Sequence, residues 1–98
     1  MLDHELLKSA AAQMMTKPEV EIGGRKFRVT RTGSQRLSTV RFLIDGKEYQ
    51  AIEQNPEKPS QWGKLARAGH RVVQIRDLAT QKYVGVVVDD RVREYGAK

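Results

Sequence analysis

The chain has 98 residues, of which 39% are hydrophobic and 31% are charged, and its formal net charge is +6. This composition is typical of one folded domain and excludes wholesale disorder. The absence of cysteine excludes disulfides and thiolate chemistry, including zinc sites built from Cys. No apolar run approaches the ~18 residues of a membrane helix, and Asp3 and Glu5 stand where a signal peptide would be basic. We therefore expect a single cytoplasmic domain, 1–98, that does not contact a membrane.

The N-terminal segment predicts a helix over about residues 3–16, capped by Asp3 and ended before Pro18. Its apolar residues recur at helical spacing and form one stripe, namely Leu6, Leu7, Ala10, Ala11 and Met14. Because this stripe is narrow and rich in alanine, two alternatives remain open. The helix segment 1–17 either lies at the periphery of a β-rich core at 19–95, or it pairs with another copy of the chain.

Strand patterns dominate the next segment, and residues 19–53 predict a four-stranded antiparallel meander. Alternating residues lead into Gly23-Gly24, which is typical of a two-residue hairpin turn. Asp45-Gly46 is the strongest hairpin signal, because a type I′ turn needs positive φ at both central positions.

The second half begins with a loop over residues 55–60 that is rich in turn-forming residues, followed by a short helix at about 60–68. Three further strands follow, and the one over 83–88 is apolar on both faces and therefore central. We predict an α+β fold with an antiparallel sheet of about seven short strands in two meanders, forming a roll or a partly closed small barrel. An open sheet with both helices on one side is the alternative.

Positive charge is concentrated in two stretches that contain no Asp or Glu, 25–41 and 58–76, which hold eleven of the 18 Lys and Arg residues. The remainder of the chain is net acidic. Such segregation is typical of a surface that binds a polyanion, and nucleic acid is the first candidate for that partner. The alternative is a solvated surface that keeps a small domain soluble.

The short helix presents the first candidate site, because Lys64, Arg67 and Arg71 share one face at i, i+3 and i+7. Its opposite face carries Trp62, which we expect to be buried in the core against sheet residues such as Val73 or Val86. Basic groups held at this spacing suit phosphate contacts.

The basic residues of the first meander form the second candidate, namely Arg25, Lys26, Arg28, Arg31, Arg36 and Arg41. Of these, Arg28 and Arg41 alternate with apolar residues on their strands and are predicted to share an exposed sheet face. Tyr49 is the one aromatic residue expected to be exposed near them. Since base stacking needs several aromatic side chains, these residues favour contact with the backbone of duplex or structured RNA.

Catalysis is not indicated by the sequence. His4 and His70 lie in different elements without metal-ligand spacing, and Asp89-Asp90 reads as a hairpin turn. No cofactor signature is present. We therefore expect a non-catalytic domain that binds nucleic acid or another polyanion. The alternative is an interaction module that forms a homodimer through its N-terminal helix or a sheet edge.

Overall fold

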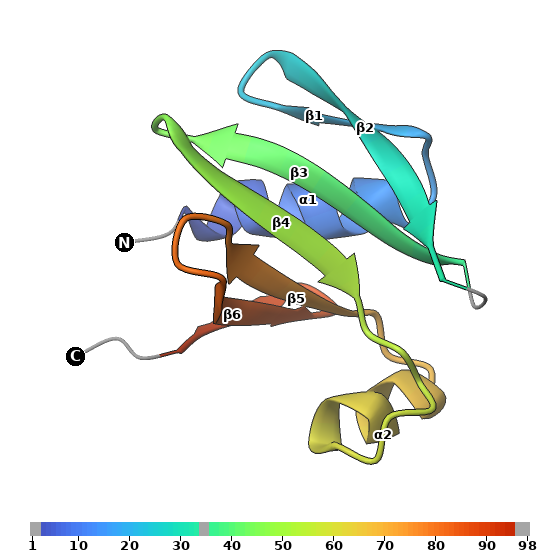
Figure 1. Cartoon of the computed structure of the whole chain (residues 1–98). Helices are drawn as coiled ribbons and strands as arrows, with labels where there is room; N and C mark the ends of the chain where they lie inside the picture. Colours follow the sequence, from blue (N-terminus) through green and yellow to red (C-terminus); the bar gives the residue numbers. More distant parts are fainter. Residues whose placement is uncertain (1–2, 34–35, 96–98) are drawn as a thin grey trace.

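The computed structural model describes residues 3–33 and 36–95; Ser34 and Gln35, which the sequence assigns to a loop, lie outside the described residues. In chain order the elements are α1 (His4–Met14), β1 (Glu19–Ile22), β2 (Arg25–Thr32), β3 (Leu37–Ile44), β4 (Lys47–Glu53), α2 (Gln61–Arg67), β5 (Val72–Asp77), β6 (Lys82–Val88) and β7 (Arg91–Glu94). All seven strands form one antiparallel sheet in sequence order, β1 to β7. Strands β1 to β6 are labelled in Figure 1. The predicted fold class is confirmed, and the sheet is open rather than closed into a barrel.

Local sequence signals explain where several helices and strands begin and end. Asp45 and Gly46 both adopt positive φ, 53° and 77°, as the type I′ hairpin between β3 and β4 requires. The carboxylate of Asp3 accepts hydrogen bonds from the backbone N–H groups of Glu5 and Leu6, which caps α1 as predicted.

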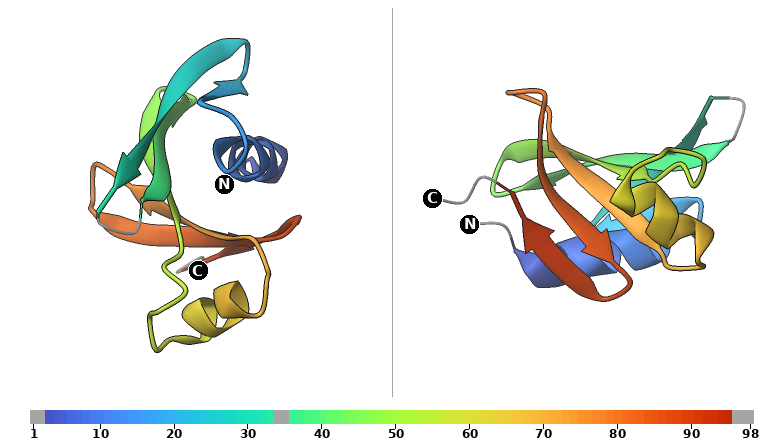
Figure 2. Two further views of the ribbon diagram at one scale, coloured as in Figure 1. Left: turned by 90° about the vertical axis from the view of Figure 1, so that its right-hand side faces the viewer. Right: turned by 90° about the horizontal axis from the view of Figure 1, so that it is seen from below.

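The sheet curves strongly around α1, which lies in its concave side (Figure 2). The helix buries four residues completely, Leu7, Ala10, Ala11 and Met14. They pack in one cluster with apolar residues of the inner sheet face, such as Val40, Phe42 and Val87. The apolar stripe of α1 is therefore part of the core, and the helix is not peripheral.

Helix α1 also contacts both edge strands, β1 and β7. The side chain of Gln13 donates to the carbonyl of Glu21 at 3.1 Å, and its amide oxygen accepts from the N–H of Glu21 at 2.9 Å. On the other side, the Nε2 atom of His4 lies 2.6 Å from a carboxylate oxygen of Glu94. The two bonds from Gln13 therefore pair the backbone groups of Glu21 at the outer edge of β1.

Helix α2 lies on the side of β5 and β6 opposite to α1 (Figure 2), so the alternative with both helices on one side is wrong. Val72 and Val86, on β5 and β6, are buried but lie outside the cluster around α1. Strand alternation assigns them to the outer sheet face, where α2 contacts β5. Within the described ranges no helix has the length and apolar character to cross a membrane.

Candidate functional site

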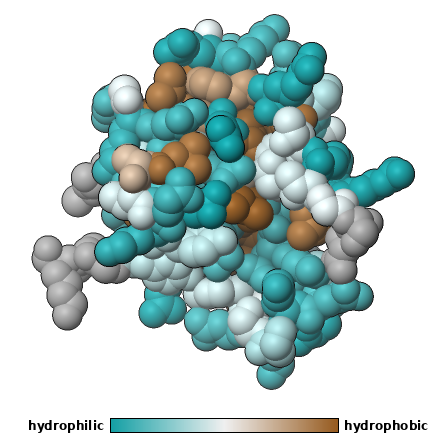
Figure 3. All heavy atoms as spheres, in the orientation of Figure 1, coloured by the Kyte–Doolittle hydropathy of each residue, from teal (hydrophilic) through white to brown (hydrophobic). Residues whose placement is uncertain are grey.

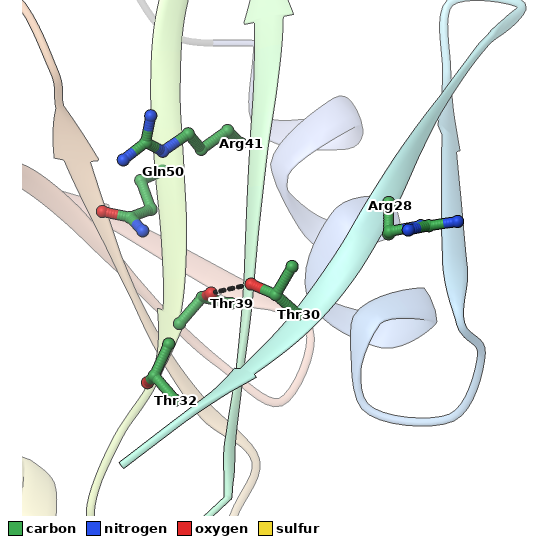
Figure 4. A pocket seen from close by; sticks show the side chains of 6 residues that line it. All are labelled: Arg28, Thr30, Thr32, Thr39, Arg41 and Gln50. Atoms are coloured by element: carbon green, nitrogen blue, oxygen red, sulfur yellow. Dashed lines mark hydrogen bonds between the residues drawn. The ribbon is translucent and has the colours of Figure 1, made fainter.

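The outer face of β2, β3 and β4 is not covered by either helix and carries a shallow hollow (Figure 4). Its lining is polar and basic, and consists of Arg28, Thr30, Thr32, Thr39, Arg41 and Gln50. Strand alternation explains this set, because the neighbours of these residues in sequence point inward and build the core. In the same orientation as Figure 1, this side of the molecule is mostly hydrophilic (Figure 3).

A pair of threonines lines the hollow beside Arg28 and Arg41. The hydroxyls of Thr30 and Thr39 are 2.8 Å apart and hydrogen-bond across the strands. Arg41 extends toward Gln50, whereas Arg28 extends toward β1 (Figure 4). Both arginines are exposed on the outer face, as the alternation predicts.

Neither guanidinium makes a salt bridge within the described part of the chain. The nearest acidic positions on this face are Glu19, which pairs with Arg28 across β1 and β2, and Glu48 on β4. Neither carboxylate forms an ion pair among the described residues. The positive charge of the hollow is therefore not neutralised by a direct carboxylate partner.

Arg76 extends this basic surface across β5, although sequence reasoning did not single it out. Gln50 pairs with Arg41 on one side and with Arg76 on the other. The Nη2 atom of Arg76 donates to the Oε1 atom of Gln50 at 2.9 Å. The alternation of Val73 and Ile75 with Gln74 and Arg76 was the signal that could have identified it. Arg28, Arg41 and Arg76, which we call the arginine row, thus bring together both acid-free stretches.

The basic residues of α2 are arranged differently from the prediction. Lys64 is exposed. The Nη1 atom of Arg67, however, donates to the carbonyl oxygens of Pro56 and Lys58, at 2.5 and 3.1 Å. Arg67 therefore links the preceding loop to α2, and these hydrogen bonds use part of the guanidinium that was predicted to contact phosphate.

Arg71 is likewise bound within the fold, to the turn between β6 and β7. Its Nη2 atom donates to the carbonyl of Asp89 at 2.7 Å, and its backbone N–H donates to the Asp89 carboxylate at 3.0 Å. The same carboxylate lies 2.8 Å from the Nδ1 atom of His70. The hydrogen bonds from the Arg71 N–H and from His70 lower the pKa of Asp89. The sequence of 58–76, which contains no acid, gave no sign of this partner, because Asp89 belongs to a segment further along the chain.

The aromatic residues also differ from expectation. Tyr49, predicted to be exposed, is buried on the inner face, with its ring centroid 6.1 Å from that of Phe42. Trp62 is only partly buried rather than in the core; its ring lies 6.3 Å from that of Tyr95. Tyr83 is the large hydrophobic residue that is exposed, with 45% of its surface accessible in the described structure.

The described residues contain no cluster of three or more His, Asp or Glu side chains that could hold a metal ion. The chain matches no protein-family model, and neither the curated proteins nor the solved structures give a significant match. The outer sheet face and α2 are therefore the surfaces from which a function can be inferred.

Proposed function

We propose that this chain is a non-catalytic, cytoplasmic domain that binds nucleic acid through the outer face of its sheet. The observation that carries the proposal is the arginine row. Arg28, Arg41 and Arg76 lie on one sheet face, and no carboxylate forms a salt bridge with them in the described part of the chain. Of the residues first considered, Arg28 and Arg41 belong to this proposed surface, Lys64 is exposed on α2, and Arg67 and Arg71 support the fold.

Guanidinium groups and hydroxyls are the donors that commonly contact phosphate oxygens. The hollow supplies both, because the hydroxyls of Thr30 and Thr39 line it together with Arg28 and Arg41. A sheet face also holds its side chains on a rigid frame, which suits an extended backbone of regularly spaced charges. These features support binding through the phosphates rather than through specific reading of bases.

The test is a fluorescence-anisotropy titration with DNA at several salt concentrations. Arg28→Gln combined with Arg41→Gln should weaken binding and flatten the log–log salt slope by about 1.8 on duplex DNA and by about 1.4 on single strands, since each phosphate contact contributes about 0.9 and about 0.7, respectively. The matched control is Arg25→Gln combined with Arg31→Gln. These two exposed arginines lie on the same strand, β2, and alternation assigns them to its other face.

Both double variants lower the net charge equally, so a loss that depends only on total charge affects them alike. The proposal expects the Arg28 and Arg41 variant to lose most of its affinity while the control keeps its salt slope. Equal loss in both variants, or no binding by the wild-type protein at low salt, would contradict it. Both variants should retain the wild-type melting temperature, since exposed substitutions change stability by less than about 0.5 kcal/mol.

A further inference from the structure

Tyr83 lies on β6 at the end of the row of residues that crosses the outer sheet face. Arg41 pairs with Gln50, Gln50 pairs with Arg76, and Arg76 pairs with Tyr83. Residues directly opposite in an antiparallel sheet share a face, with Cβ atoms about 4.5–5.5 Å apart. Tyr83 therefore stands beside Arg76, and three strand spacings, or roughly 15 Å, separate it from Arg41.

A single exposed aromatic residue is ordinary on a protein surface. The position of Tyr83 is what distinguishes it. Tyr83 as a residue is 45% exposed and lies opposite Arg76, and the hydrogen bond to Gln50 orients the Arg76 guanidinium. The bulge between Ile75 and Arg76, where the register with β6 shifts, brings Tyr83 rather than Val84 opposite Arg76. Val84 instead packs against the core.

We propose that the outer sheet face binds single-stranded nucleic acid, with one base stacked on Tyr83 and the adjoining phosphates on Arg76 and Arg41. This inference rests on the proposed function and specifies its ligand. Proteins that bind single strands without strong sequence preference combine basic residues along the nucleic-acid backbone with aromatic rings on which bases stack. A duplex cannot present an unstacked base to Tyr83, so single strands are favoured over duplex.

The experiment compares two fluorescein-labelled probes of equal length, an oligothymidine and an abasic phosphodiester strand. The phosphates are the same in both, so only stacking separates their affinities. The wild-type protein should bind the oligothymidine about tenfold more tightly than the abasic strand. Tyr83→Ser should reduce that ratio to near one, while Tyr83→Phe, which retains a ring, should keep most of it.

Arg28→Gln combined with Arg41→Gln should weaken the binding of both probes and leave their ratio unchanged. Tyr83→Ser should keep the wild-type urea midpoint, because the ring is exposed. An affinity ratio between oligothymidine and the abasic strand that is near one for the wild type, or that Tyr83→Ser leaves unaltered, would overturn stacking on Tyr83. In that case salt-dependent binding of both probes would still support the proposed function. Failure of both probes and of duplex DNA to bind at low salt would overturn the two proposals together.

Discussion

Gly63 lies inside α2, where helix propensity alone favours alanine by about 1 kcal/mol. The structure leads to the opposite expectation for Gly63→Ala. A Cβ atom at this position would lie 2.1 Å from the carbonyl oxygen of Lys58 and 3.0 Å from its carbonyl carbon. Because these are backbone atoms, the contact cannot be relieved by rotating a side chain. The helix and the loop must separate by roughly 1 Å or more.

The cost of that separation exceeds the gain in propensity. Overpacking a close contact typically costs about 1–3 kcal/mol. The same movement strains the hydrogen bonds from Arg67 to Pro56 and Lys58, and bonds from charged donors contribute about 1.5–3 kcal/mol each. We expect Gly63→Ala to destabilise α2 and its loop by about 1–3 kcal/mol.

Urea unfolding followed by circular dichroism measures the global effect, and the fluorescence of Trp62, the one tryptophan in the chain, reports on α2 itself. Local detachment of α2 would shift the Trp62 emission to longer wavelength even where the sheet stays folded. Lys64→Ala is the control, since this exposed neighbour should change stability by less than about 0.5 kcal/mol. A Gly63→Ala protein that is more stable than wild type, with unchanged Trp62 emission, would refute the reasoning.

Two further predictions concern the core and an ion pair. Leu7→Ala should lower the free energy of unfolding in urea by about 2–5 kcal/mol, because Leu7 is completely buried. Glu5→Ala, on the exposed side of the same helix, is the control and should lower it by under about 0.5 kcal/mol. A loss below about 1 kcal/mol for Leu7→Ala would contradict the burial of this side chain. The hydrogen bond from Lys47, 2.8 Å away, lowers the pKa of Asp77 in the folded protein. The Asp77 carboxylate therefore stabilises the fold above its unfolded-state pKa near 4, and this stabilisation is lost as the pH falls through the lower pKa of the folded state. Unfolding free energies measured from pH 5 downward should therefore fall less steeply in Asp77→Asn than in wild type or in the exposed control Asp90→Asn, and parallel profiles would contradict this.

The strand order and the hairpins could be predicted because their signals are local. Asp45-Gly46 and Gly23-Gly24 specify two-residue turns, and period-two alternation assigns each strand its inner and outer residues. The same alternation correctly placed Arg28 and Arg41 on the outer face. Applied to β5, it would also have placed Arg76 beside them.

The errors at Arg71 and Trp62 involve contacts between segments distant in sequence. Nothing within 58–76 indicates that Arg71 binds Asp89, eighteen residues further along the chain. Tyr49, by contrast, could have been placed from the sequence, because the Asp45-Gly46 turn brings it opposite Phe42 on the inner face. The exposed position of Tyr83 depends on the bulge beside Arg76. Trp62 was expected in the core, yet the core is already filled by α1, and α2 packs on the outer face instead.

The contrast between the two basic groups bears on function. Arg67 and Arg71 have carbonyl partners, and the fold accounts for them. The arginine row instead gathers like charges on one sheet face, on β2, β3 and β5, without a salt-bridge partner among the described residues, and such self-repulsion lowers stability unless something neutralises it. Threonine or glutamine would serve the sheet equally well at Arg41, since its side chain contributes nothing to the inner core. A bound phosphate backbone would neutralise the row, and this is the physical reason to connect these arginines, rather than those of α2, with a polyanionic ligand.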